Sequence, residues 1–243
     1  MSQVDQVGDG IYRISMFNPQ IGITFNQFLI DDDQPALIHT GTHHMFDDVY
    51  AAISKVLDPK TLKYVIVPHF EADECGGMGR FVKEAKDSTL GCSEVGAAVN
   101  LSGWDYVGPV KGVRDGDKID LGKHKLRFLE TPHVHHWDSM MLMDETTQSL
   151  FPADLFLQPG DQPHTVSENL AKEMCGLYRT VGIFGGREPV LQVVDRVEKM
   201  NFKRIHPMHG GSLVEEVLPK YYDALRNERF WYDGRIFGRS LVS

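Results

Sequence analysis

Apolar residues recur along the chain at two spacings, one typical of strands and one typical of helices. Runs rich in β-branched and aromatic residues, with turn residues between them, predict strands. They cover residues 10–17, 24–30, 36–40, 64–67, 89–93 and 125–131, a hairpin of 139–143 with 149–152, and a last strand at 203–207. The first three runs predict a meander, and the run at 64–67 predicts a buried strand.

Helical spacing follows several of these runs. Helices are predicted at residues 49–57, 78–85, 189–200 and 214–226. An Asp-Pro pair ends the first of them, and the third has a proline in its first turn and four valines on one face. Because strands and helices alternate and the strands fall into two groups, the pattern predicts an α/β sandwich.

Length and composition are those of a folded protein with a proper core. The chain has 243 residues, of which 42% are hydrophobic, and no Pro- or Ser-rich linker interrupts it. Two-layered α/β sandwiches reach this length as one unit. We therefore expect a single domain over residues 1–243.

The net charge and the cysteines indicate which classes of partner and which cellular compartment to expect. A formal net charge of −9, without a long Lys/Arg cluster, argues against a nucleic-acid partner, because phosphate binding needs a basic face. No stretch approaches the roughly 20 apolar residues of a membrane span, and the polar first residues carry no secretory signal. Three widely spaced cysteines favour reduced thiols. These features predict a cytoplasmic protein without nucleic-acid or membrane partners.

A dense polar cluster follows the predicted buried strand. His69, Glu71, Asp73 and Glu74 are four ionisable side chains within six residues. Carboxylates packed together at the mouth of a buried strand repel one another unless cations lie among them. Alternating positions of an extended segment put His69, Glu71 and Asp73 on one side. The cluster therefore predicts a metal site, with a solvated acidic loop as the alternative.

Further polar groups stand where other strands are expected to end. His135 is one of three histidines, with His133 and His136, of which at least one or two are expected to be surface imidazoles. Asp154 lies between apolar neighbours, where a carboxylate is usually partnered or caps a helix. His209 precedes two glycines, and alone it would more often be structural. Together the groups favour metal binding.

The ordered set resembles the metallo-β-lactamase superfamily. The usual first motif of that superfamily is H-x-H-x-D-H, typical of zinc hydrolases. Glutamate in place of the second histidine marks the flavodiiron branch and its flavodoxin-less relatives, the oxygen-binding di-iron proteins. His69-x-Glu71-x-Asp73 is similar to that branch residue for residue.

The resemblance continues along nearly the whole chain. Residues 131–140 are similar to the branch's T-P-x-x-H-W-P-D-S-M, which selects His135 from the three histidines. Asp154 falls on the family's bridging aspartate, and His209 stands in P-M-H-G, which resembles the terminal P-S-H-G. The resemblance implies a four-layered αββα metallo-β-lactamase-type sandwich.

The family's arrangement implies the ligands and the metals. One metal takes His69, Glu71 and His135, the other takes Asp73 and His209, and Asp154 bridges them. Three imidazoles with several carboxylates suit two iron ions better than zinc, with manganese as a less favoured choice. A carboxylate bridge holds such metals roughly 3.5–4 Å apart, so that both reach one diatomic molecule, O2 or NO.

The chain also departs from the family pattern. Glu74 stands where the family has histidine, so it either ligates the second metal or accepts hydrogen bonds near it. His39 replaces an aspartate at the end of an early strand, and the His-Trp pair at 136–137 displaces the usual Trp-Pro. We expect supporting or surface roles, and no metal ligation, for His39, His43 and His44.

Three functions fit these observations. The first is an oxidoreductase that reduces O2 or NO with electrons from a separate donor protein, since this chain offers neither an FMN-binding flavodoxin domain nor rubredoxin-type Cys-x-x-Cys motifs. The second is an O2-sensing or O2-carrying module without turnover. The third is a metal-dependent hydrolase, which should carry histidine where this chain has Glu71. The resemblance also implies a homodimer.

Overall fold

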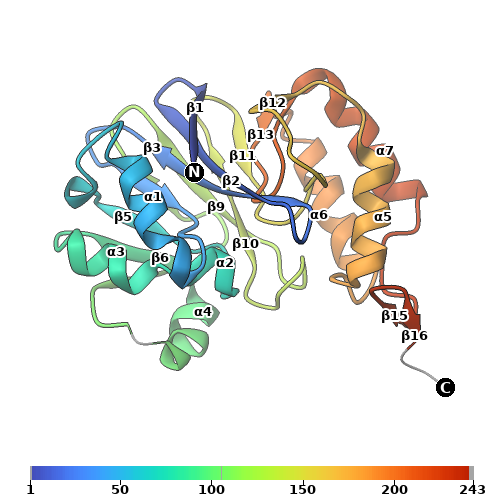
Figure 1. Cartoon of the computed structure of the whole chain (residues 1–243), viewed down its shortest axis with the longest axis horizontal. Helices are drawn as coiled ribbons and strands as arrows, with labels where there is room; N and C mark the ends of the chain where they lie inside the picture. Colours follow the sequence, from blue (N-terminus) through green and yellow to red (C-terminus); the bar gives the residue numbers. More distant parts are fainter. Residues whose placement is uncertain (1, 105, 241–243) are drawn as a thin grey trace.

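The computed structural model describes residues 2–104 and 106–240 (Figure 1). Of the domain predicted for residues 1–243, positions 1, 105 and 241–243 lie outside the described residues. Two seven-stranded sheets form the centre of the described chain. In Figure 1 the helices lie outside them, with α1 and α3 on one side and α5, α6 and α7 on the other.

The first sheet holds the N-terminal half of the chain. Its strands run in the order β1 (Gln3–Gly8), β2 (Ile11–Asn18), β3 (Ile23–Ile30), β4 (Ala36–Ile38), β5 (Tyr64–Ile66), β6 (Thr89–Ser93) and β7 (Val110–Val113). β1 to β4 pair antiparallel, so the predicted meander is confirmed, and β4 to β7 pair parallel. The central parallel strand β5 has the continuous apolar character expected of a strand that is covered on both faces.

The second sheet holds the C-terminal half. Its order is β12 (Thr165–Val166), β14 (Ser212–Val214), β13 (Arg204–Ile205), β11 (Ser149–Phe151), β10 (Met140–Asp144), β9 (Lys125–Glu130) and β8 (Lys118–Asp120). The predicted hairpin is the antiparallel pair β10–β11, in which Leu142 lies opposite Phe151. A two-stranded hairpin, β15 (Arg235–Ile236) with β16 (Arg239–Ser240), lies near the C-terminus.

Helices cover the outer face of each sheet. They are α1 (Phe46–Ile53), α2 (Ala72–Cys75), α3 (Met78–Glu84), α4 (Glu94–Ala98), α5 (Ala171–Val181), α6 (Glu188–Glu198) and α7 (Leu218–Asn227), with short 3-10 turns at His43–Met45, Pro59–Thr61, Asn100–Gly103 and Glu215–Val217. Among the residues that the structure describes, no helix combines the length and the apolar character that crossing a membrane requires.

Three apolar cores hold these layers together. One lies between the sheets and includes the fully buried rings of Phe28, Phe128 and Phe151. The other two join the first sheet to α1 and α3, and the second sheet to α5, α6 and α7. The order helix, sheet, sheet, helix confirms the four-layered αββα sandwich.

Several elements differ from the hydrophobic pattern. α1 begins at Phe46 and ends at Ile53, so the predicted helix at 49–57 starts too late and ends too late. α5 and β1 were not predicted. α5 buries residues at helical spacing, but they include an alanine, a cysteine and a tyrosine rather than the larger aliphatic residues that mark the other helices. β1 is a mostly polar edge strand.

Candidate metal centre

The predicted polar residues come from strand ends in both sheets. His69 follows β5 of the first sheet, whereas His135, Asp154 and His209 follow β9, β11 and β13 of the second sheet. A backbone hydrogen bond from the Met140 N–H to the Pro68 carbonyl, 3.0 Å long, joins the sheets beside His69. The fold thus gathers residues that are up to 140 positions apart (69 to 209).

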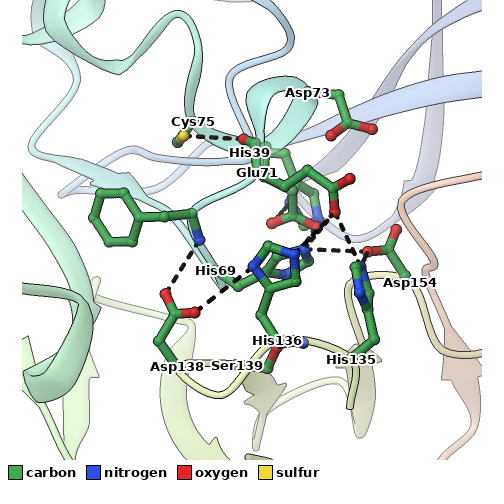
Figure 2. A network of polar contacts seen from close by, with 12 residues as sticks. His39, His69, Glu71, Asp73, Cys75, His135, His136, Asp138, Ser139 and Asp154 are labelled. Atoms are coloured by element: carbon green, nitrogen blue, oxygen red, sulfur yellow. Dashed lines mark hydrogen bonds and ion pairs between the residues drawn. The ribbon is translucent and has the colours of Figure 1, made fainter. Parts of the chain in front are cut away.

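Two imidazoles and two carboxylates surround one point, which we name the Glu71 end. Oε2 of Glu71 lies 3.3 Å from Nε2 of His69 and 3.0 Å from Nε2 of His135. Oδ2 of Asp154 lies 3.2 and 3.0 Å from the same two nitrogens. Metal bonds of about 2.1 Å bring neighbouring ligand atoms to about 3–3.5 Å, so these four atoms have the spacing of a metal's ligands. Figure 2 shows the side chains turned toward one another.

The second oxygen of Asp154 faces another pair of residues, which form the Asp73 end. Oδ1 of Asp154 lies 3.2 Å from Nε2 of His209, and Oδ2 of Asp73 lies 3.4 Å from that nitrogen. Asp154 therefore presents one oxygen to each end. This is the geometry of a carboxylate that joins two cations.

The backbone around Glu71 differs from the prediction of an extended segment. Glu71 is extended, with φ −118° and ψ 155°, but α2 begins at the next residue. The Cys75 N–H donates to the Glu71 carbonyl (2.9 Å), which closes the first helical turn. Asp73 lies inside this turn, so its side chain diverges from that of Glu71, as Figure 2 shows. This divergence lets neighbouring residues reach different ends of the centre.

Charges in the centre shift the pKa values strongly. Hydrogen bonds with His135 and His69 lower the pKa of Glu71 to about 2. Burial opposes charge on the rings, but contacts with Asp154 outweigh it and raise the pKa of His135 to about 9 and that of His209 to about 10. Burial also opposes the Asp154 carboxylate, yet the surrounding imidazoles hold its pKa well below the usual value. The carboxylates thus form a strongly cation-seeking site, and the donor set fits metal ions.

Glu74 lies on the side of the His69 ring that faces away from Glu71. Its Oε2 is 2.9 Å from Nδ1 of His39, and its Oε1 is 3.6 Å from Nδ1 of His69, the ring nitrogen that faces away from Glu71. Within the described chain neither Oε1 nor that Nδ1 has a hydrogen-bond partner. Glu74 is also within 4.8 Å of possible ligand atoms on His69 and Asp154, but its shorter contacts are with the two rings. The geometry favours a carboxylate that orients a metal-binding histidine.

Two of the three departures from the family pattern therefore meet in one contact, between His39 and Glu74. The chain has histidine at 39 and glutamate at 74, and both side chains are fully buried. His43 and His44 are exposed, in agreement with their predicted exclusion from the ligand set. His133 is exposed as well, but His136 is half-buried, and its Nε2 lies 3.7 Å from Oε2 of Glu71.

Two supporting groups escaped sequence reasoning. The first is Tyr178 of α5, whose hydroxyl donates to the Asp154 carbonyl (2.7 Å) and accepts from the Leu157 N–H (3.2 Å). Tyr178 is fully buried, and a buried tyrosine usually has a polar partner. Sequence reasoning missed it together with the helix that carries it.

The second is the buried pair of Arg13 and Asn26, which we name the clamp because both side chains hydrogen-bond to the loop of His209. The Nδ2 amide of Asn26 donates to the Gly210 carbonyl (2.7 Å), and Arg13 donates to the same carbonyl (2.9 Å) and to Asn26 Oδ1 (2.9 Å). Nδ1 of His209 lies 2.9 Å from the Thr24 carbonyl. An Nδ1–H donating to that oxygen leaves Nε2 free to face the centre.

A cavity of about 610 Å³ opens beside the centre. Its floor includes Glu71, Asp73, His135, Asp154 and His209. Most of its wall is apolar and includes Ile21, Ile23, Leu177, Ile183 and Phe237. No lysine or arginine of the described chain lines it. The cavity therefore favours neutral molecules over anions.

Known proteins are similar to this chain in sequence and in fold. The family model described as ODP family beta lactamase matches residues 23–210. A nitric oxide reductase of Moorella thermoacetica is 27% identical over 234 residues, which are 86% of this chain and 57% of that protein. Flavo-diiron protein FprA2 of Clostridium acetobutylicum is 27% identical over 234 residues, with 88% and 58% covered.

A solved structure gives the same result for the fold. The rubredoxin oxygen:oxidoreductase of Desulfovibrio gigas superposes with a TM-score of 0.82 at 21% identity, over 92% of this chain and 60% of that protein. The chain thus spans about 60% of the length of each of these three proteins. The match over residues 23–210 is more than half of the 243 residues. The chain therefore belongs to the ODP family of beta-lactamase-like proteins, and its fold is that of the metallo-β-lactamase-type core of flavodiiron proteins.

Proposed function

We propose that this chain is a non-heme di-iron protein that binds O2 or NO and reduces it with electrons from an external donor protein. The observation that carries the proposal is the position of Asp154, whose two oxygens face two separate sets of imidazole and carboxylate groups. One buried carboxylate between two such sets suits a pair of metal ions.

The donor atoms support iron. The proposed ligands are three imidazoles and three carboxylates, namely His69, His135, His209, Glu71, Asp73 and Asp154. Such a nitrogen and oxygen set with positions left for a small molecule suits iron, and manganese is the nearest alternative. A structural zinc site is usually a closed tetrahedron rich in thiolate or imidazole. A bound iron pair supplies one electron from each ion.

The cavity supports a neutral substrate. Its apolar wall and the lack of lysine or arginine in its described lining disfavour phosphate or carboxylate substrates. Glu71, which stands where a zinc hydrolase of the superfamily carries histidine, also argues against hydrolysis. The names of two similar proteins, a nitric oxide reductase and a rubredoxin-oxygen oxidoreductase, agree with NO and O2 as candidates.

Electrons must come from outside the described chain. Its three cysteines are buried free thiols, and burial raises the pKa of Cys75 above its usual range and that of Cys92 and Cys175 to about 12. Such thiols are poor nucleophiles and poor redox groups. We therefore propose a separate electron-donor protein. We also propose a homodimer, which light scattering of the purified protein would test.

Metal analysis followed by O2 addition tests the proposal. Protein from cells grown with both iron and zinc is expected to contain two irons per chain. Anaerobic reduction and O2 addition, with reductant in excess, should then consume reductant continuously. Uptake of one O2 per site without further consumption would indicate the O2-sensing module instead. Zinc alone, with no O2 reactivity, would contradict the proposal and favour the hydrolase.

A further inference from the structure

A further imidazole lies at the Glu71 end of the centre. The ring of His136 has its centroid 4.7 Å from that of His69 and 4.5 Å from that of His135. Each of these three rings and Glu71 offers one ligand atom, and the four atoms lie within 4.8 Å of one another. The sequence pattern had assigned no metal-binding role to His136, because the flavodiiron motif has tryptophan at this position.

A buried carboxylate lies on the other side of the His136 ring. Oδ1 of Asp138 is 3.8 Å from Nδ1 of His136. Asp138 is 2% exposed, and its Oδ2 accepts from the Phe70 N–H (3.2 Å). Its Oδ1 has no hydrogen-bond partner among the described residues. A buried acceptor without a donor is unfavourable, so Oδ1 of Asp138 is available to accept from the ring N–H of His136.

Three hydrogen bonds hold the backbone of His136. Its N–H donates to Oγ of Ser139 (2.9 Å), and its carbonyl accepts from the N–H groups of His133 (2.7 Å) and Ser139 (3.2 Å). Its Nε2 lies 3.7 Å from Oε2 of Glu71, only 0.4 Å farther than the 3.3 Å of His69. With its backbone held in this way, His136 keeps Nε2 at the edge of the ligand shell.

We propose that His136 is a further metal ligand at the Glu71 end, and that Asp138 orients its ring. The arrangement, one ring nitrogen toward the metal and the other toward a carboxylate, is the usual environment of a metal-binding histidine. The proposal rests on the proposed function, because it requires a metal ion at the Glu71 end. It assigns His136 a role that the family motif does not contain.

The added ring makes the two ends unequal. The Glu71 end would hold three imidazoles, from His69, His135 and His136, whereas the Asp73 end holds one, from His209. Nitrogen-rich sites bind late first-row divalent metals more tightly than carboxylate sites do. We therefore expect divalent metals to fill the Glu71 end first and the Asp73 end second.

Co(II) is a suitable probe because it reports both affinity and the number of bound imidazoles. The full chain would be titrated with CoCl2 and followed by visible absorption, and the loaded protein by the hyperfine-shifted N–H signals of its imidazoles in proton NMR. The wild type is expected to bind two Co(II) in two steps and to show four shifted imidazoles. Three shifted imidazoles in the wild type would overturn the proposal without any variant.

Variants provide the second test. His136→Ala should weaken the tighter binding step by about 10- to 100-fold, leave the weaker step unchanged and remove one shifted imidazole signal. His133→Asn, an exposed neighbour with φ 66°, is the control and should change nothing. Asp138→Asn should weaken the same step as His136→Ala and keep all four signals.

The outcomes separate this proposal from the proposed function. If His136→Ala binds both Co(II) ions with wild-type constants and keeps every signal, His136 is not a ligand and the two-metal centre stands. If the wild type binds no Co(II), or only one, the proposed di-metal function itself fails.

Discussion

The Glu71 end and the Asp73 end of the centre share Asp154 and the segment after β5, but their other residues come from different parts of the fold. Loops after β5 and β9 form the Glu71 end, where the side chains contact one another directly. The Asp73 end depends on β2 and β3, whose Arg13 and Asn26 hold the loop of His209. The comparison teaches that two ends of one polar centre can be supported by separate networks. Substitutions should therefore affect them separately.

The largest effect is expected where the two ends meet. Asp154→Ala removes one oxygen from each end, so both metals should bind at least about 100-fold more weakly, since a bridging ligand counts for both ions. Metal content after gel filtration measures this loss. Asp48→Asn, at an exposed position of α1, should retain the wild-type content. Two tightly bound metals in Asp154→Ala would show that Asp154 does not join the ends.

A change at Glu74 should act on the Glu71 end. Glu74→Gln keeps the shape of the side chain but weakens the contacts with His69 and His39. Because outer carboxylates orient metal-binding histidines, the affinity at the Glu71 end should fall about 10- to 100-fold. Stepwise Co(II) titration is the measurement. If the affinity of the Asp73 end falls instead, Glu74 is a ligand of the second metal.

A change at the clamp should act on the Asp73 end. Asn26→Leu removes the amide that donates to the buried Pro207 carbonyl and the oxygen that accepts from Arg13 Nε, so it should lower the free energy of unfolding by about 2–3 kcal/mol. It should also weaken the Asp73 end by about tenfold, because His209 loses its fixed loop. Urea unfolding and Co(II) titration check both effects, with the exposed Asn227→Leu as control. Equal weakening of both ends would refute the separation of the two networks.

The smallest effect on the centre is expected from a buried pair in β10 and the turn before β9. Nδ1 of His124 lies 2.8 Å from Oδ2 of Asp144, and this hydrogen bond raises the pKa of His124. Because the folded pKa is raised, the contribution to stability is complete below the unfolded pKa of about 6.5 and is lost as pH rises through the folded value. His124→Gln should leave both Co(II) constants unchanged.

The pH dependence gives this prediction its own test. Burial opposes the Asp144 carboxylate, but the hydrogen bond with His124 outweighs it, so the pKa of Asp144 is lowered and the carboxylate stays charged down to acidic pH. Near pH 5.5 the free energy of unfolding of the wild type should be about 1–3 kcal/mol larger than that of His124→Gln, and this difference should shrink at higher pH. Urea unfolding from pH 5.5 to 9 measures it. A difference that grows with pH would contradict the assignment.

Local sequence was enough to predict much of the fold, and together with the family pattern it pointed to six residues that the fold brings close to one another. The run at β5 and the polar residues after it are local features, and strand ends that meet at one edge bring such residues together. The family motif then selected His135 from its neighbours. Neither step requires knowledge of side-chain packing.

The supporting contacts could not be predicted, because they depend on tertiary structure. Tyr178 reaches Asp154 only through the packing of α5, whose buried residues are an alanine, a methionine, a cysteine and Tyr178 itself. His39 and Glu74 are 35 positions apart, and each was seen only as a separate departure from the family pattern. The extended conformation expected at 69–73 was wrong, because the helical turn of α2 begins after Glu71.

X-ray absorption at the iron edge of the iron-loaded protein tests the two-metal centre most directly. Two irons joined by Asp154 should give nitrogen and oxygen neighbours near 2.1 Å and an iron neighbour roughly 3.5–4 Å away. The Asp154→Ala variant should lose the iron neighbour. Iron bound to the wild type with light-atom neighbours alone, and no second iron within that distance, would contradict the account.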